Sequence, residues 1–145
     1  MSTIKKFLNL IFIDGLSGMA LGLFSTLIIG TILKQAADLI GGDFGYYLGV
    51  FAVMAQRLTG AGIGIGVAYK YKSSTYVTLS AAAAGMIGAY ATAIISGSIL
   101  SDGALVYSGP GDPLSAFIAA LAGIAVGSLP AGKTKLDLLI TPAVT

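Results

Sequence analysis

The chain lacks the residue types on which most catalytic and metal sites depend. It has no cysteine, so it offers neither a disulfide framework nor a thiolate ligand. Cysteine usage therefore does not indicate whether the protein occupies an oxidising or a reducing compartment. It also has no histidine, which is the commonest metal ligand and general base at neutral pH. No nucleophile–base pair, metal cluster or carboxylate dyad can be assembled from the residues that remain. We therefore expect no catalytic residues, no metal and no cofactor.

Charge is also scarce. Charged residues are 10% of the 145, against roughly one quarter in a soluble domain, and 56% of the residues are hydrophobic. A net charge of +2, without a basic face, argues against nucleic acid as a partner. These proportions predict an all-α, polytopic transmembrane helical bundle surrounded by membrane lipids.

The positions of the few charges predict the topology. Six of the eight basic residues form three pairs, separated by stretches of about 60 residues that suffice to cross a bilayer twice: Lys5/Lys6, Lys70/Lys72 and Lys133/Lys135. The turns between these pairs carry mostly acidic residues: Asp38, Asp43, Asp102 and Asp112, with Lys34 as the one base. The positive-inside rule then places the N-terminus in the cytoplasm of a multi-pass protein of a bacterial cell membrane. Tyr69 and Tyr71 suit an aromatic belt at the interface.

The apolar runs predict about four membrane-spanning helices and the start of a fifth. The four are Phe7–Leu33, Tyr46–Ala68, Tyr76–Leu100 and Leu114–Leu129, with Lys34–Gly45 and Ser101–Pro113 as outer connections. The first is about 40 Å long, so in a ~30 Å hydrocarbon core it must tilt, bend at its glycines or begin along the interface. The last apolar segment, Leu136–Thr145, is too short to span. We expect residues 1–145 to be a single transmembrane domain, the N-terminal half of a longer protein.

Glycine is concentrated in the predicted spans. The ridges Gly18-x-x-x-Gly22 and Gly123-x-x-x-Gly127 favour close helix packing. In Gly60–Gly66 glycine recurs at every second position, which covers more than one helix face, and each glycine costs about 1 kcal/mol relative to alanine. We expect a bent or unwound stretch there, of the kind that lines substrate cavities in transporters. Simple helix packing is the alternative.

Asp14 and Arg57 are the two charges inside apolar spans, where a charge is expensive unless it faces protein or water. One interpretation is a structural ion pair between antiparallel helices. Helical side chains lean toward the N-terminus of their own helix, which increases the axial offset between these two and favours separate roles. The candidate substrate-binding residues are therefore Arg57, Gln56, Thr59, Gly62, Gly64 and Asp14.

Several segments of this sequence resemble a known family. The opening Lys5–Asn9, the run Asp14–Leu33, Gly60–Tyr69 and Gly132–Pro142 are similar to the EIIC-like membrane proteins of bacterial phosphotransferase systems. That group also contains proteins described as perfringolysin regulators, and its members are considerably longer than this chain. The resemblance implies a sugar permease domain, fed by cytoplasmic partner subunits that phosphorylate the sugar as it enters.

The chain departs from that family in one respect. Sugar-transporting EIIC domains carry essential glutamate or histidine residues at the sugar, and this chain has neither type. The leading interpretation is a membrane-embedded permease domain for a sugar or another small polar solute, acting as a homo-oligomer. The alternatives are a membrane-bound regulator or ligand sensor without transport activity, and a purely structural membrane module.

Overall fold

The structure is a computed structural model that describes residues 2–107, 109–129 and 143–145. In chain order its helices are α1 (Ser2–Asn9), the π-helical η1 (Leu10–Gly15), α2 (Leu16–Leu23), the π-helical η2 (Phe24–Ile28), α3 (Ile29–Ile40), α4 (Gly42–Arg57), α5 (Thr59–Lys70), α6 (Thr75–Ala89), α7 (Ala91–Ser96) and α8 (Pro113–Gly127). The strands β1 (Leu100–Ser101) and β2 (Ala104–Leu105) form a small antiparallel hairpin. The predicted all-α class is confirmed, with this hairpin as the one departure in the described part.

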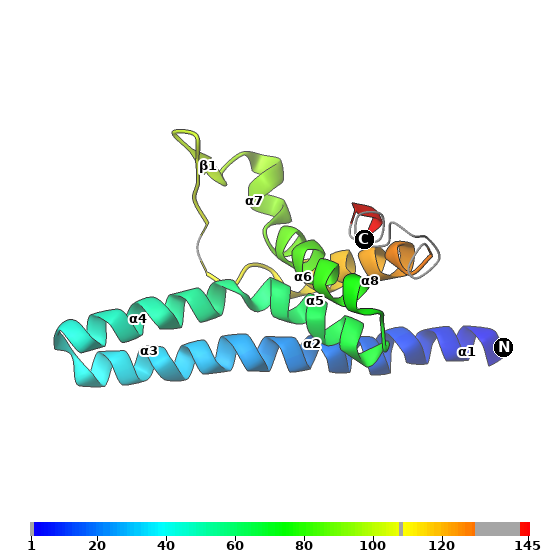
Figure 1. Ribbon diagram of the computed structural model, residues 1–145, viewed down its shortest axis with the longest axis horizontal. Helices are drawn as coiled ribbons and strands as arrows, with labels where there is room; N and C mark the ends of the chain where they lie inside the picture. The colour runs from blue at the N-terminus through cyan, green and yellow to red at the C-terminus, as the bar shows by residue number, and fades with distance from the viewer. Residues whose placement is uncertain (1, 108, 130–142) are drawn as a thin grey trace.

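The N-terminal segments α1 to α3 form one helix of 39 residues, Ser2–Ile40, which runs the length of the molecule (Figure 1). At 1.5 Å per residue it measures about 58 Å, well beyond a ~30 Å hydrocarbon core. The glycines predicted as bend points, Gly15, Gly18 and Gly22, are instead buried against other elements. The irregularity takes the form of the two π-helical segments η1 and η2.

Among the described residues, Ser2–Ile40 alone is a helix long and apolar enough to cross a membrane unaided. The pair α4 and α5 meets the same criteria only when its two members are taken together across a 48° bend. Helices α6 and α8 are apolar but shorter than a span. Membrane-length helical structure is thus present, and the four-span arrangement remains a prediction.

The predicted outer connection Lys34–Gly45 is far shorter than expected, and its expected loop character is wrong. The chain is helical on both sides of Gly41, whose φ of 66° turns it back so that α3 and α4 lie antiparallel (Figure 1). The polar residues that suggested a loop lie on the exposed side of α3, where Lys34 and Asp38 form a 3.7 Å ion pair at i, i+4 spacing. Polar residues at that spacing fit a helix surface as well as they fit a loop.

The predicted break in the second helix exists, but its position is wrong. It lies at Leu58, whose amide donates to the Ala55 carbonyl at 3.2 Å instead of continuing the α-helical pattern. The Thr59 hydroxyl donates to the Gln56 carbonyl at 2.6 Å and so satisfies an acceptor at the bend. The glycine run Gly60–Gly66 is itself regular helix within α5.

The alternating glycines of α5 face two different helices. A Cβ at Gly60 or Gly64 would collide with the backbone of α6, at Gly85 and Ala81. A Cβ at Gly62 or Gly66 would collide with the N-terminal helix, at Gly22 and Gly18. Glycine at every second position therefore permits backbone contact on both sides of α5, and packing repays the low helix propensity that had suggested an unwound stretch.

The predicted helix Tyr76–Leu100 is also shorter than expected. Helix α6 begins at its cap Ser74, whose hydroxyl accepts from the Val77 amide at 3.4 Å, and ends at Ala89. Tyr90 leaves helical geometry, α7 follows, and the hairpin turns on Asp102-Gly103, both with positive φ. Asp-Gly with positive φ at both positions is the preferred two-residue hairpin turn, a signal that lies inside the predicted loop Ser101–Pro113.

Helices α5, α6 and α8 enclose the hydrophobic core, which centres on Ile63, Val67, Val77, Ala81 and Ala120. Asp112 caps α8, because its carboxylate accepts from the Leu114 amide at 3.1 Å and from the Ser115 hydroxyl at 2.5 Å. These hydrogen bonds, the one from the Ser115 side chain first, lower the pKa of the exposed Asp112 carboxyl. The predicted segment Leu136–Thr145 and the pair Lys133/Lys135 lie outside the described residues, apart from residues 143–145.

Candidate functional site

Three interruptions of helical structure meet near one point of the bundle. The first is the bend at Leu58, and the second is the break at Tyr90. The third is the irregular segment before α8, where the Asp112 amide donates to the Ala89 carbonyl at 2.8 Å and the Gly109 carbonyl accepts from the Tyr90 hydroxyl at 2.6 Å. In a membrane, non-helical backbone is tolerated only where protein buries it or where it lines a hydrated cavity.

Arg57 lies at this point and stacks on an aromatic pair. Its guanidinium carbon is 5.2 Å from the centroid of the Tyr107 ring, which is 5.0 Å from the Tyr90 ring centroid. Such a cation–π contact is worth roughly 0.5–2 kcal/mol. We call Arg57, Tyr90 and Tyr107 the Arg57 cluster.

One donor of Arg57 is unused. The side chain is half-buried, and its Nε is a buried atom without a hydrogen-bond partner among the described residues. A buried donor left unsatisfied costs about 1–3 kcal/mol. An oxygen that accepted from Nε would remove this cost.

The Arg57 cluster joins two hollows in the surface. Arg57 lines a cleft of about 470 Å³ between α3 and α4, which also contains the Lys34–Asp38 ion pair and Tyr46. Tyr90 and Tyr107 line an apolar cavity of about 390 Å³ between α6, α7 and the hairpin. The stacked Arg57 and Tyr107 side chains therefore lie where the cleft beside α4 and the apolar cavity adjoin.

Two other predicted site residues, Thr59 and Gln56, lie beside Arg57 and make contacts that support the fold. Thr59 is fully buried, and its hydroxyl accepts from the Thr26 hydroxyl at 3.1 Å while it donates to the Gln56 carbonyl. The side chain of Gln56 packs over Gly30 of α3. Both residues hold the bend against the N-terminal helix and so position Arg57. Gly62 and Gly64 are the packing positions of α5 described above.

Asp14 lies elsewhere in the bundle. The contacts of Gly18 with Gly66 and of Gly22 with Gly62 fix the antiparallel register, which puts Asp14 about 20 Å along the axis from the level of Arg57. No ion pair joins the two within the described ranges. The interpretation as a structural pair is therefore wrong, and the separate roles of the two charges stay a prediction.

The surroundings of Asp14 include Tyr71, in the turn after α5. The Tyr71 hydroxyl donates to the Leu10 carbonyl at 2.8 Å, so this tyrosine ties the turn to the N-terminal helix instead of serving only as an interface anchor. Burial and, second, the Asp14 carboxylate raise the pKa of the Tyr71 hydroxyl, which keeps it protonated as a donor.

Sequence reasoning identified Arg57 and missed its aromatic partners. Tyr90 was hidden inside an expected continuous helix, and Tyr107 precedes a stretch dense in glycine and proline that indicated only a turn. Within the described residues there is no group of acidic side chains that could hold a metal ion.

The fold and the Arg57 cluster define a helical protein of membrane type with interrupted helices around a half-buried arginine. The model of the family described as "Phosphotransferase system, EIIC" matches residues 13–145, and the chain belongs to this family. Membership implies a bacterial membrane location and a sugar substrate, and it confirms the resemblance seen in the sequence. No curated protein and no solved structure matches the chain.

Proposed function

We propose that this protein is a membrane-embedded sugar permease domain of a phosphotransferase system, and that the Arg57 cluster binds the sugar during passage. The observation that carries the proposal is the unpartnered, buried Nε of Arg57 at the meeting point of three helix interruptions. A guanidinium fork donates to two adjacent hydroxyl oxygens, which is the arrangement that a sugar presents. The ring of Tyr107 offers an apolar face against which a sugar ring can lie.

The topology we propose has four crossings with the N-terminus in the cytoplasm. It is supported by the hydrogen bond from Tyr71 to Leu10, which holds the α5–α6 turn, with Lys70 and Lys72, against the N-terminal helix, whose first turns carry Lys5 and Lys6. The α3–α4 turn lies at the opposite end of the long helix (Figure 1). Four of the five described lysines thus gather at one end of the bundle, with Lys34 near the other, as the positive-inside rule favours for a cytoplasmic face.

In this proposal the chain moves the sugar and does no chemistry on it. Cytoplasmic partner subunits of the phosphotransferase system phosphorylate the sugar, and the domain acts within a homo-oligomer. Gln56, Thr59, Gly62 and Gly64 position the bend that presents Arg57, and Asp14 acts independently of the sugar.

The proposal is tested by sugar accumulation. Bacteria lacking their own uptake systems would express the protein and be supplied with ¹⁴C-labelled hexoses and hexitols. Arg57→Lys keeps the charge and loses Nε and the fork. A hydrogen bond to a charged group is worth about 1.5–3 kcal/mol, so uptake at matched abundance should fall roughly 10- to 150-fold at limiting sugar.

The matched control is Lys34→Gln, which removes an exposed cation from the same cleft and should leave uptake within about twofold, as expected for a surface ion pair. Wild-type uptake by Arg57→Lys would overturn the assignment of the site. Specific sugar binding to the purified protein without any accumulation in cells would instead identify a membrane-bound sensor.

A further inference from the structure

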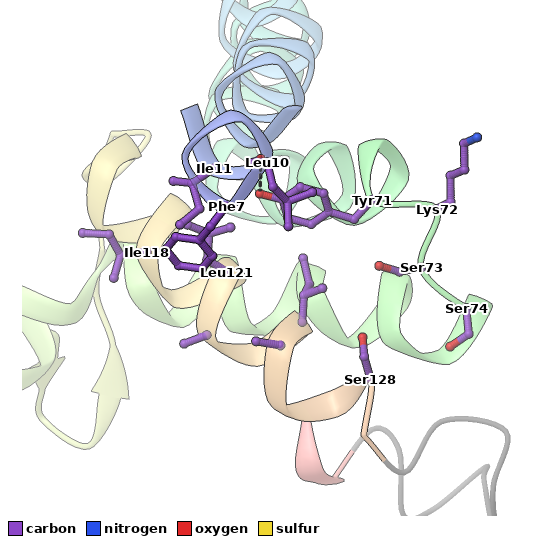
Figure 2. A pocket seen from close by; sticks show the side chains of 13 residues that line it. Phe7, Leu10, Ile11, Tyr71, Lys72, Ser73, Ser74, Ile118, Leu121 and Ser128 are labelled. Carbon is purple, nitrogen blue, oxygen red and sulfur yellow. Dashed lines mark hydrogen bonds between the residues drawn. The ribbon is translucent and has the colours of Figure 1, made fainter. Parts of the chain in front are cut away.

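A second site lies at the lysine-rich end of the molecule. A groove of about 750 Å³ opens between the N-terminal helix, the α5–α6 turn and α8 (Figure 2). Its walls are apolar and come from helices far apart in the sequence, with Phe7, Leu10 and Ile11 on one side and Ile118 and Leu121 on the other. The groove does not include the Arg57 cluster.

One end of the groove is polar. Lys72, Ser73 and Ser74 of the turn line it there, and Ser128 approaches from the end of α8 (Figure 2). The Lys72 side chain extends outward from the groove, so its ammonium group must swing inward to reach a ligand at the serines. Three hydroxyls and one ammonium group are donors to an oxygen-rich anion. The hydroxyl of Tyr71 is already committed to the Leu10 carbonyl and so belongs to the wall.

Lysines outnumber carboxylates at this end of the part that the structure describes, where Asp14 lies near Tyr71. Among the described residues no carboxylate lines the groove, and Lys72 is accompanied by Lys70 on α5 and by Lys5 and Lys6 on the first helix. The groove therefore combines a long apolar trough with a cationic, hydroxyl-lined rim. The apolar trough matches the acyl chains of an anionic phospholipid, and the cationic rim matches its phosphate.

We propose that this groove binds an anionic phospholipid, with its acyl chains along Phe7, Ile11 and Leu121 and its phosphate at Lys72, Ser73 and Ser128. The charge complementarity selects the headgroup, and the apolar walls select a lipid over a soluble anion. A lipid in this position bridges the N-terminal helix and α8, and so stabilises the end of the bundle. The proposal does not depend on sugar transport.

The test is native mass spectrometry of the full chain in neutral detergent, titrated with phosphatidylglycerol or phosphatidylcholine of identical acyl chains. A lysine near an anionic headgroup contributes about 1 kcal/mol, or roughly fivefold in affinity. The wild-type protein should bind phosphatidylglycerol at least about fivefold more tightly than phosphatidylcholine. Lys72→Gln should lose about that factor, and Lys34→Gln, on α3 outside the groove, should not.

A second pair of variants tests the apolar trough. Ala125 is exposed and lines the groove, so Ala125→Phe should fill it and reduce the binding of both lipids. Val126 is the next residue, exposed but not part of the groove, and Val126→Phe should bind lipid like the wild type. Thermal unfolding of each variant establishes that it is folded.

Three outcomes would overturn the proposal. Equal affinity for the two lipids would remove headgroup recognition. Unchanged lipid binding in Ala125→Phe would place the lipid elsewhere on the protein. Competition by millimolar inorganic phosphate that removes the preference for phosphatidylglycerol would identify the rim as a site for a soluble anion.

Discussion

Replacing Gly64 by alanine should push α5 and α6 apart. An added Cβ would overlap the Ala81 carbonyl oxygen and lie 2.6 Å from the Ala81 carbonyl carbon and 3.1 Å from the Ala82 amide nitrogen. These are backbone atoms, so no side-chain rotation relieves the overlap. Gly49 in α4 is the matched control, because a Cβ there would meet only the Ala37 Cβ at an ordinary 3.8 Å.

The magnitude follows from two opposing terms. Both substitutions gain about 1 kcal/mol of helix propensity. Gly64→Ala also introduces overpacking, which costs typically 1–3 kcal/mol and here acts on a backbone contact at the upper end of that range. We expect Gly64→Ala to destabilise the protein by about 1–2 kcal/mol and Gly49→Ala to stabilise it by up to about 1 kcal/mol.

The assay is thermal unfolding in detergent, followed by circular dichroism at matched protein and detergent concentrations. The melting temperature of Gly64→Ala should fall below that of the wild type, and that of Gly49→Ala should equal or exceed it. If both variants melt together, or if Gly64→Ala is the more stable, α5 and α6 are not in backbone contact and the packing interpretation of the glycine run is refuted.

Three further predictions concern other parts of the fold. Thr26→Val removes the hydroxyl that donates to Thr59 and should lower the free energy of unfolding by about 1 kcal/mol in the same melting assay. Single cysteines at Thr75 and Ser101 should react with an impermeant thiol reagent from opposite sides of the membrane, and same-side labelling would exclude the proposed topology. Because folding lowers the pKa of Asp112, its carboxylate stabilises the protein above the unfolded pKa of about 4, and this stability is lost as the pH falls through the folded-state pKa. Asp112→Asn should abolish that part of the dependence of stability on acid pH.

The family and the helical class could be predicted because they depend on composition and on local residue patterns. The caps at Ser74 and Asp112 and the turn at Asp102-Gly103 are local in the same sense, although the last was assigned to a longer loop. Arg57 could be singled out because a charge in an apolar run is conspicuous whatever the fold.

The position of the helix break could not be predicted, because it depends on tertiary contacts. Leu58 is neither glycine nor proline, and the hydroxyls of Thr59 and Thr26 that support the bend belong to residues 33 apart in sequence, on different helical segments. The glycine spacing of α5 is ambiguous for the same reason. From the sequence alone, a glycine-rich helix that packs closely on two faces has the same pattern as a helix of low intrinsic stability.

The aromatic half of the Arg57 cluster depends on loop closure. Tyr107 reaches Arg57 only because the Tyr90 hydroxyl and the Ala89 carbonyl hold the segment before α8 against α6. Each of these contacts joins residues that are distant in the sequence and share no motif, so the sequence does not indicate that they form one site. Reasoning from charges and glycines inside apolar spans therefore finds the arginine and misses the tyrosines.

The central claim, that Arg57 and Tyr107 act together on a transported sugar, is tested most directly by a double-mutant cycle on the initial rate of ¹⁴C-sugar uptake. Arg57→Lys and Tyr107→Leu should each reduce uptake, and the double variant should be little worse than either alone, with a coupling energy of about 1 kcal/mol or more. Uptake that falls by the product of the two single effects, or that is unchanged in both single variants, would contradict the account.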